Sequence, residues 1–170
     1  MKKSFIDRLY WGFWCSTTLL TGILAGYMVS HSIMLGRFFN WYVKSGNMDL
    51  LRQTYTVFRN SSNAHALYDI PLYLALVSGI IWIILSLILK RDRVIAFIAG
   101  LAAFWVGMIF SIADLDEAEE AVLTGVADDK MAQLYLSINI PLHSTFAAIF
   151  IISTLLLLFV ALKNRKKAGL

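Results

Sequence analysis

The side chains best suited to chemistry in this chain are its three histidines, His31, His65 and His143, each beside apolar sequence. Asp69 follows His65 by four residues, so the two share a face if the backbone is helical there. Imidazole and carboxylate groups bind zinc, iron and copper, and two histidines with one carboxylate leave positions open for substrate or oxygen. We therefore predict a transition-metal site (Fe, Cu or Zn) with His31, His65, Asp69 and His143 as ligands.

Four more side chains are expected to support this site. Asn139 precedes His143 by four residues and could be a further ligand or a hydrogen-bonding group behind the ligands. Asp114 and Glu117 are spare carboxylates at the rim, in an acidic run whose simplest interpretation is a solvated face. Tyr73 belongs to an expected aromatic roof over His143, together with Tyr27 and Phe110.

The same histidines allow two chemistries other than a small metal site. His31 and His143 could ligate a haem b from two sides, which we rank below a site of one or two metal ions. Alternatively, His143 acts as a general base in a pocket without a cofactor. An ionisable group inside an apolar segment is costly and points to function, so His143 is the residue hardest to explain structurally.

The pattern Asx-Ile-Pro-Leu occurs twice, at residues 69–72 and 139–142. Asp69 and Asn139 would cap helices that begin just before the prolines. The alternative is that both helices begin earlier and contain Pro71 and Pro141. Asp128 or Asp129 would then cap the helix that leads into the last segment.

These residues are positioned by four apolar segments. The chain has 170 residues, of which 59% are hydrophobic and 15% charged, too apolar for a soluble domain of this size. Segments 9–35, 70–89, 94–113 and 138–162 reach spanning length. We predict an all-α fold, a single domain over residues 1–170 that forms an antiparallel bundle of four transmembrane helices. A single cysteine excludes an internal disulfide.

The distribution of charge predicts the topology of this bundle. The N-terminus, the second connection and the tail hold 10 of the 15 basic residues, whereas the other two connections hold 9 of the 11 acids. The positive-inside rule therefore places both termini in the cytoplasm, and we expect a multi-pass protein of the bacterial inner membrane. All three histidines then lie toward the outer end. This topology explains the basic composition without nucleic acid as a partner.

Two further features concern packing. Met48, Leu51, Tyr55 and Phe58 recur at helical spacing within residues 36–63, which predicts an outer amphipathic helix. Gly22 and Gly26 provide a small face for close helix packing, either inside the bundle or against a partner.

The order of parts resembles a known family. A glycine-rich first helix (residues 22–30), an outer amphipathic stretch, a helical hairpin, a polar outer segment and a last helix are similar to the small four-helix membrane proteins grouped with anthrone oxygenases. The resemblance implies oxidation of a small hydrophobic molecule by oxygen. We therefore expect a membrane-embedded, metal-dependent oxidoreductase or oxygenase acting on a small lipophilic substrate. The alternative is a non-enzymatic membrane module: a subunit of a homo-oligomer or larger complex, or a protein that binds haem, metal or a small molecule.

Overall fold

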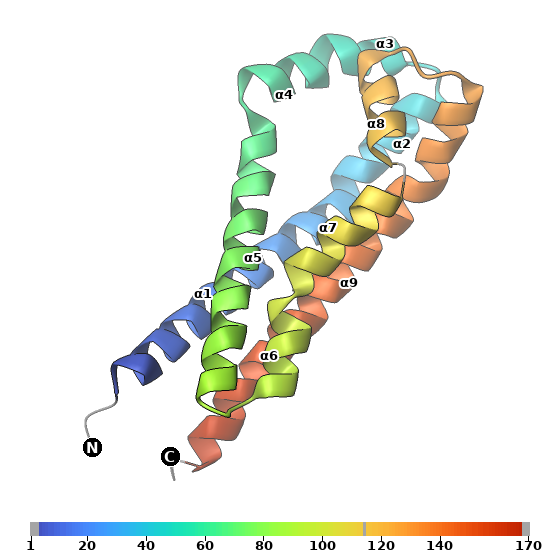
Figure 1. Cartoon of the computed structure of the whole chain (residues 1–170). Coiled ribbons are helices and arrows are strands. Elements are labelled where there is room, and N and C mark those ends of the chain that lie inside the picture. The colour runs from blue at the N-terminus through green and yellow to red at the C-terminus, as the bar shows by residue number, and fades with distance from the viewer. Residues whose placement is uncertain (1–3, 114, 168–170) are drawn as a thin grey trace. The chain divides into compact units, whose positions relative to one another are not determined.

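Helices are the only regular elements in the part of the chain that the structure describes (Figure 1). This computed structural model describes residues 4–113 and 115–167, except for the side chains of residues 64, 65 and 165–167. The elements in order are α1 (Phe5–Ser30), the π-helix η1 (His31–Leu35), α2 (Gly36–Lys44), α3 (Met48–Leu51), the π-helix η2 (Arg52–Thr56), α4 (Val57–Ser61), α5 (Ala64–Ile88), α6 (Arg93–Gly100), α7 (Ala102–Ile112), α8 (Leu115–Thr124) and α9 (Asp129–Lys167). The predicted all-α class is confirmed.

Four helical stretches are long and apolar enough to cross a membrane: Phe5–Lys44, Ala66–Ile88, Arg93–Ile112 and Asp129–Asn164. They contain the four predicted segments almost entirely, but three of them start or end well beyond the predicted bounds. The first continues without interruption from α1 through η1 into α2. The third is divided at Leu101, between α6 and α7.

The two prolines lie inside helices α5 and α9. The cap interpretation of Asp69 and Asn139 is therefore wrong, and the alternative of an earlier helix start is confirmed. The side chain that caps α9 is Asp128, whose Oδ1 accepts a hydrogen bond from the Met131 N–H at 2.7 Å. A proline inside a spanning helix is tolerated where neighbouring groups form hydrogen bonds with the backbone carbonyls that it leaves unpaired. Proline therefore does not mark the start of a helix here.

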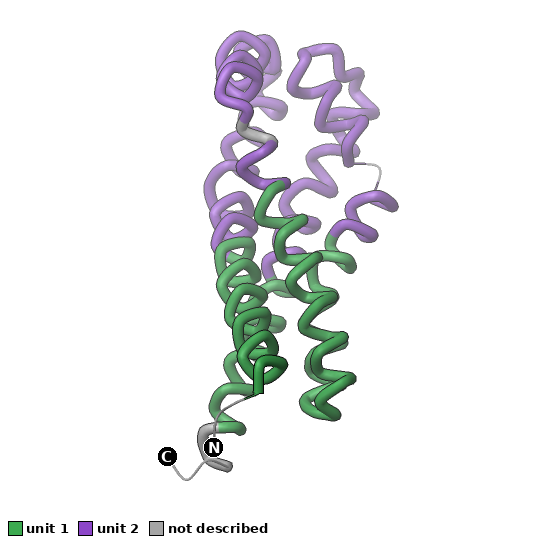
Figure 2. Tube along the Cα trace, turned by 60° about the vertical axis from the view of Figure 1, so that its left-hand side comes forward, with its two compact units in different colours: residues 1–25, 70–106, 148–170 green, residues 26–69, 107–147 purple. Residues whose placement is uncertain are grey.

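The chain forms two compact units, coloured separately in Figure 2. Unit 1 comprises residues 1–25, 70–106 and 148–170, and unit 2 comprises residues 26–69 and 107–147. In unit 1, helices α1, α5, α6 and α9 meet in one apolar core, made of Tyr10, Trp82, Leu85, Ala96, Ala99, Leu157 and Val160. This core packs the four apolar helices against one another, as the predicted bundle requires.

In unit 1 the backbones of α5 and α6 approach each other closely at two glycines. A Cβ added at Gly79 would overlap the carbonyl oxygen of Gly100, and one added at Gly100 would lie 3.0 Å from the Gly79 carbonyl oxygen. Gly22 and Gly26 have a different environment, since a Cβ at either would meet no described atom within 4 Å. The prediction that they pack inside the bundle is wrong, because α1 turns Thr17, Thr21 and Leu24 toward the interior instead.

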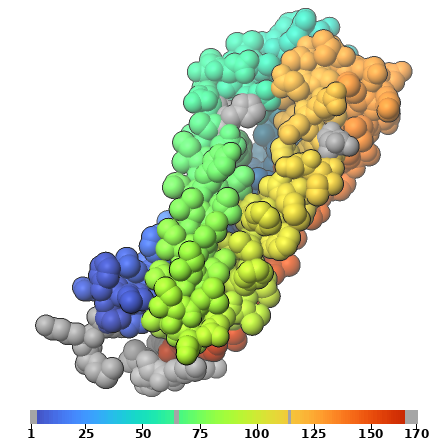
Figure 3. Space-filling view, in the orientation of Figure 1, coloured from blue at the N-terminus to red at the C-terminus, as the bar shows by residue number. Residues whose placement is uncertain are grey.

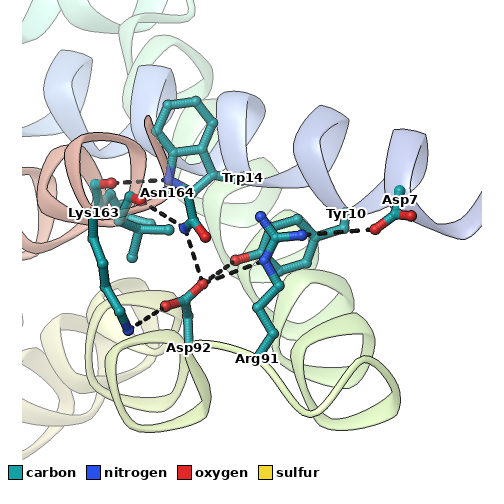
Figure 4. A network of polar contacts seen from close by, with 9 residues as sticks. Asp7, Tyr10, Trp14, Arg91, Asp92, Lys163 and Asn164 are labelled. Carbon is teal, nitrogen blue, oxygen red and sulfur yellow. Dashed lines mark hydrogen bonds and ion pairs between the residues drawn. The ribbon is translucent and has the colours of Figure 1, made fainter. Parts of the chain in front are cut away.

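A polar network in unit 1 surrounds Asp92, in the short connection between α5 and α6 (Figure 4). Its carboxylate accepts hydrogen bonds from the Tyr10 hydroxyl at 3.0 Å, from Lys163 Nζ at 2.9 Å and from Asn164 Nδ2 at 3.3 Å. The Arg91 guanidinium lies over the Tyr10 ring, 4.4 Å from its centroid. Burial alone would raise the pKa of Asp92, but these hydrogen bonds outweigh it and hold the pKa below its usual value.

In unit 2, α8 packs against α3 and η2, and their side chains adjoin in the space-filling view (Figure 3). The Thr56 hydroxyl donates to the Leu123 carbonyl at 2.7 Å, and Arg59 Nη2 binds Glu120 Oε2 at 2.9 Å. Of the predicted amphipathic stripe, Leu51 is fully buried and Tyr55 is half-buried, whereas Phe58 is 59% exposed. The stripe therefore faces inward along only part of its length.

Replacing Gly79 by alanine is expected to destabilise the protein, because the added methyl group meets the rigid Gly100 backbone. Such overpacking costs about 1–3 kcal/mol. Gly107→Ala is the matched control, since a Cβ there would meet no described atom within 4 Å. Thermal unfolding in detergent should show a lower Tm for Gly79→Ala alone, and equal effects in both variants would contradict the contact.

Asp92→Asn is expected to lower stability at neutral pH and to matter less in acid. A carboxyl whose pKa is lowered by folding stabilises the protein fully above its ordinary value of about 3.9, and this contribution is lost as the pH falls through the folded value. Hydrogen bonds to a charged group contribute about 1.5–3 kcal/mol each. The denaturation midpoint of Asp92→Asn should therefore lie well below that of the unmodified protein at about pH 7. At about pH 3 the difference between the two midpoints should be smaller.

Asp7→Asn serves as the control for this comparison, because Asp7 is less buried than Asp92 and lies at the edge of the same network, 3.6 Å from Arg91 Nη1. It should change the midpoints little. A stability difference for Asp92→Asn that is the same at both pH values would show that its charge is not what stabilises the network.

Candidate functional site

The candidate site lies in unit 2 and begins with His31, the first residue of η1. A π-helix is a rare local widening of an α-helix that occurs frequently at functional sites. Gly36 provides the space for the imidazole, since a Cβ there would lie 3.0 Å from His31 Cδ2. The position of the ring therefore depends on both the widened turn and the missing side chain.

His31 and His143 lie face to face, although 112 positions separate them in the sequence. Their ring centroids are 3.6 Å apart and their planes differ by 14°. His143 is 8% exposed and His31 is partly buried. Two positively charged rings at this separation would repel each other strongly, so the stack requires at least one neutral imidazole.

Asn139 is the hydrogen-bonding centre of the site and is 1% exposed. Its Nδ2 lies within hydrogen-bonding distance of three acceptors, which share its two protons: the Gly36 carbonyl at 3.3 Å, Asn40 Oδ1 at 2.9 Å and the Tyr135 hydroxyl at 3.0 Å. Its Oδ1 is 3.0 Å from His31 Nε2, and its backbone carbonyl is 2.8 Å from His143 Nδ1. One residue therefore holds both histidines.

These contacts assign the tautomer of each ring. The Gly36 carbonyl can only accept, which fixes the Asn139 amide with Nδ2 toward Gly36 and Oδ1 toward His31. His31 must then donate through Nε2, and His143 must donate through Nδ1 because its partner is a backbone carbonyl. In the neutral rings, His31 Nδ1 and His143 Nε2 are left with free lone pairs.

Aromatic side chains surround the histidine pair. Phe39 contacts His31 with a centroid distance of 6.3 Å, and Phe146 contacts His143 at 5.9 Å. Phe110, one of the residues predicted for the aromatic roof, packs on Phe146 at 6.2 Å. A lone pair in these apolar surroundings is stronger as a base or acceptor than one that water solvates.

The other predicted site residues do not join this pair where they are described. Asp69, Tyr73 and Glu117 are exposed, and Tyr73 is 66% exposed. His65 lies in α5 with Asp69, as the four-residue spacing suggested, but its side chain is outside the described residues, and so is Asp114. The structure therefore brings together His31, His143 and Asn139 from the predicted set.

The sequence interpretation missed Asn40 and Tyr135, which complete the site. Asn40 lies on the buried face of α2, whose buried residues are Gly36, Phe39, Asn40 and Val43. That spacing of three and four residues was visible in the sequence and could have identified Asn40 as a polar residue on an apolar face. Tyr135 is one turn before Asn139 on α9 and is fully buried.

The arrangement of the two rings does not fit the predicted metal site. A metal ion lies about 2.0–2.1 Å from an imidazole nitrogen, along a lone pair in the plane of the ring. One ion cannot lie in the planes of two nearly parallel rings stacked 3.6 Å apart. Stacked rings likewise leave no space for a haem between them. Among the described residues, no three His, Cys, Asp or Glu side chains form a group suited to a metal ion.

Comparison with known proteins does not assign the chain to a family. No family model matches the chain, and searches of curated proteins and of solved structures gave no match. The functional argument therefore depends on the chemistry of the site.

Replacing Asn139 by leucine, which has a similar volume, should release both the His31 ring and the Nδ2 acceptors. A buried polar group left without a partner costs about 1–3 kcal/mol, so the variant should be less stable by at least that amount. Nitrogen-15 NMR of labelled histidine should show His31 changing from one tautomer to a mixture. His143 should keep its Nδ1 proton, since its partner is the backbone of residue 139.

Ser137→Ala is a matched control, because Ser137 lies on the same helix and its hydroxyl donates, among the described residues, only to the local Leu134 carbonyl, at 2.8 Å. It should leave both histidine tautomers unchanged. A single unchanged His31 tautomer in Asn139→Leu would contradict the assignment.

Proposed function

We propose that this protein is a membrane-embedded enzyme in which His143 transfers a proton to or from a small lipophilic substrate. The observation that carries the proposal is the pair of stacked histidines whose tautomers are set by one asparagine. A general base needs a free lone pair at a defined place and a partner that fixes the opposite nitrogen. His143 has both, since Nδ1 donates to the Asn139 carbonyl and Nε2 carries the lone pair.

The environment of His143 supports catalysis more than packing. An imidazole buried in a spanning segment is costly, and a leucine in its place would pack without that cost. The neighbouring rings of Phe146 and Phe110 suit an aromatic or otherwise apolar substrate that enters from lipid. His31 stacks on one face of the His143 ring and places a second imidazole beside the reacting nitrogen.

The expected oxidoreductase activity is compatible with this role if His143 performs the proton-removal step of the oxidation. Many oxidations of organic molecules begin with removal of a proton from a C–H or O–H bond, which is the step that a general base performs. The resemblance to the anthrone oxygenases stays a prediction at this level, and so does the topology with both termini in the cytoplasm. The stacked rings cannot both bind one metal ion. This favours a general base that acts without a metal over the metal-dependent enzyme.

The rival is a non-enzymatic module in which Asn139, His31 and His143 only fasten α9 to η1 and α2. Interhelical hydrogen bonds of this kind do stabilise membrane proteins, by about 0.6 kcal/mol each on average. The two functions differ in what His143 Nε2 does. A packing role needs only the Nδ1 donor, whereas a catalytic role needs the free nitrogen.

Deuterium exchange tests the proposal directly, because it needs no electron acceptor. The purified protein in D2O is incubated with a panel of small lipophilic carbon acids, and deuterium incorporation is measured by mass spectrometry. General-base catalysis contributes about 10²–10⁴-fold, so His143→Gln should lower the exchange rate of an accepted compound by at least about 100-fold. Asp69→Asn should exchange at the unmodified rate, since Asp69 is exposed.

The same preparations distinguish the metal-dependent form. Metal content is measured in untagged protein purified without chelator, before and after the His143→Gln change. Stoichiometric iron, copper or zinc that is lost in both His143→Gln and Asp69→Asn would overturn the proposal and restore the predicted metal site. Equal exchange by His143→Gln and the unmodified protein would favour the non-enzymatic module.

A further inference from the structure

The charged side chains of unit 1 gather at one end of its helices, where α1 begins and α9 ends. Among the residues of unit 1 whose side chains the structure describes, they are Asp7, Arg8, Lys90, Arg91, Asp92, Arg93 and Lys163. Two ion pairs bring these distant segments together. Arg91 Nη1 is 3.6 Å from Asp7 Oδ1. Lys163 Nζ is 2.9 Å from Asp92 Oδ1. We call this group of seven residues the charged end of unit 1.

The charged end has an excess of positive charge. Its seven side chains are five cations and two carboxylates, which gives a net charge of +3. Arg8, Lys90 and Arg93 are exposed, and none of them forms an ion pair with another described residue. Such a surface attracts anions.

The guanidinium group of Arg91 is held in place by two aromatic rings. Its central carbon lies 4.4 Å from the centroid of the Tyr10 ring and 4.9 Å from that of Trp11. Figure 4 shows the side chain over Tyr10, between the carboxylates of Asp7 and Asp92. A planar group fixed against rings has already lost rotational freedom, so a ligand that binds it has less ordering entropy to overcome.

The two carboxylates do not use all the hydrogen-bond donors of Arg91. Its Nε is 3.5 Å from Asp92 Oδ2, and this distance and the 3.6 Å to Asp7 exceed the usual hydrogen-bond range of about 2.7–3.2 Å. Nε is buried and has no hydrogen-bond partner among the described residues, although the side chain as a whole is 27% exposed. The donors left for a ligand are therefore the terminal nitrogens Nη1 and Nη2. Paired N–H groups of this kind bind two oxygens of one phosphate.

Tryptophans indicate that the charged end lies at the membrane surface. Trp11 and Trp14 are half-buried and pack edge to face, with ring centroids 5.2 Å apart. Tryptophan is enriched where lipid headgroups meet the acyl chains. Further along α1, Leu19 and Ile23 are 62% and 37% exposed and share one face of the helix. Arg91 is thus at headgroup level, with apolar helix surface beside it for acyl chains.

We propose that Arg91 binds the phosphate of an anionic phospholipid at the charged end of unit 1. Nη1 and Nη2 donate to two phosphate oxygens, and the net positive charge around them favours a headgroup that is negative overall. Basic pockets between membrane helices bind anionic headgroups in this way. The proposal concerns unit 1 alone and does not depend on the histidine pair of unit 2.

The carboxylates of the charged end explain why the headgroup should lack an ammonium group. A zwitterionic lipid would bring an ammonium group among the cations, where it would need a carboxylate. Asp92 Oδ1 already accepts from Lys163 at 2.9 Å, and its Oδ2 from the Tyr10 hydroxyl at 3.0 Å. Asp7 Oδ2 accepts from the Ser4 hydroxyl at 3.0 Å. A lipid with a phosphate and no ammonium group leaves these contacts intact.

Thermal unfolding of the full-length protein in a neutral detergent tests the site. Phosphatidylglycerol or phosphatidylcholine is added in steps, and an apparent dissociation constant is fitted to the rise in Tm. We expect phosphatidylglycerol to raise the Tm much more than phosphatidylcholine does. Arg91→Lys keeps the charge and loses the paired donors, so it should weaken the phosphatidylglycerol constant at least about tenfold. The Tm without lipid shows that each variant is folded.

Arg93→Lys is the matched control, because Arg93 lies in the same connection and is exposed. It should bind phosphatidylglycerol as the unmodified protein does. Equal weakening in both variants, or none in either, would overturn the assignment of the phosphate to Arg91. Equal stabilisation of the unmodified protein by the two lipids would overturn the preference for an anionic headgroup. Inorganic phosphate that stabilises the protein as much as phosphatidylglycerol, at equal phosphate concentration, would show a free anion instead of a lipid.

Discussion

The side-chain amide of Asn139 is the interaction on which the polar interior of unit 2 depends. In a lipid-facing protein each buried polar group must find its partner within the chain, because water does not supply one. Asn139 meets this requirement for four other residues through its amide and for His143 through its backbone carbonyl. It joins the start of α9 to η1 and α2. The positions of both histidines, and so the chemistry proposed for them, follow from that one residue.

Much of the architecture could be predicted from the sequence, because the lipid environment leaves few alternatives. Spanning length and the alternating charge of the connections were enough to predict four helices and to bring His31 and His143 to one end. Helix starts were harder. Pro71 suggested a boundary that the structure does not have, since an apolar helix can continue through a proline when its backbone is satisfied elsewhere.

The candidate site shows a different limit. Residue types and spacing indicate which side chains can act as metal ligands, but they do not distinguish two rings that converge on an ion from two rings that stack. That difference depends on the widened turn at His31 and on the space left by Gly36. The glycines show the same limit, since the pair at positions 22 and 26 resembles a packing motif, whereas Gly79 and Gly100 make the actual contact without any repeated pattern.

The contact between Gly79 and Gly100 also bears on how the protein is made. These glycines face each other across a hairpin closed by only a few residues, so little chain entropy opposes their meeting. Helices α5 and α6 can therefore pack against each other before the rest of the bundle has formed. Asp92 at the tip of that pair has Arg91 beside it from the start, 3.5 Å away, but it gains Lys163 only after the last helix has been synthesised. The last helix therefore completes an electrostatic contact that the first hairpin has already exposed.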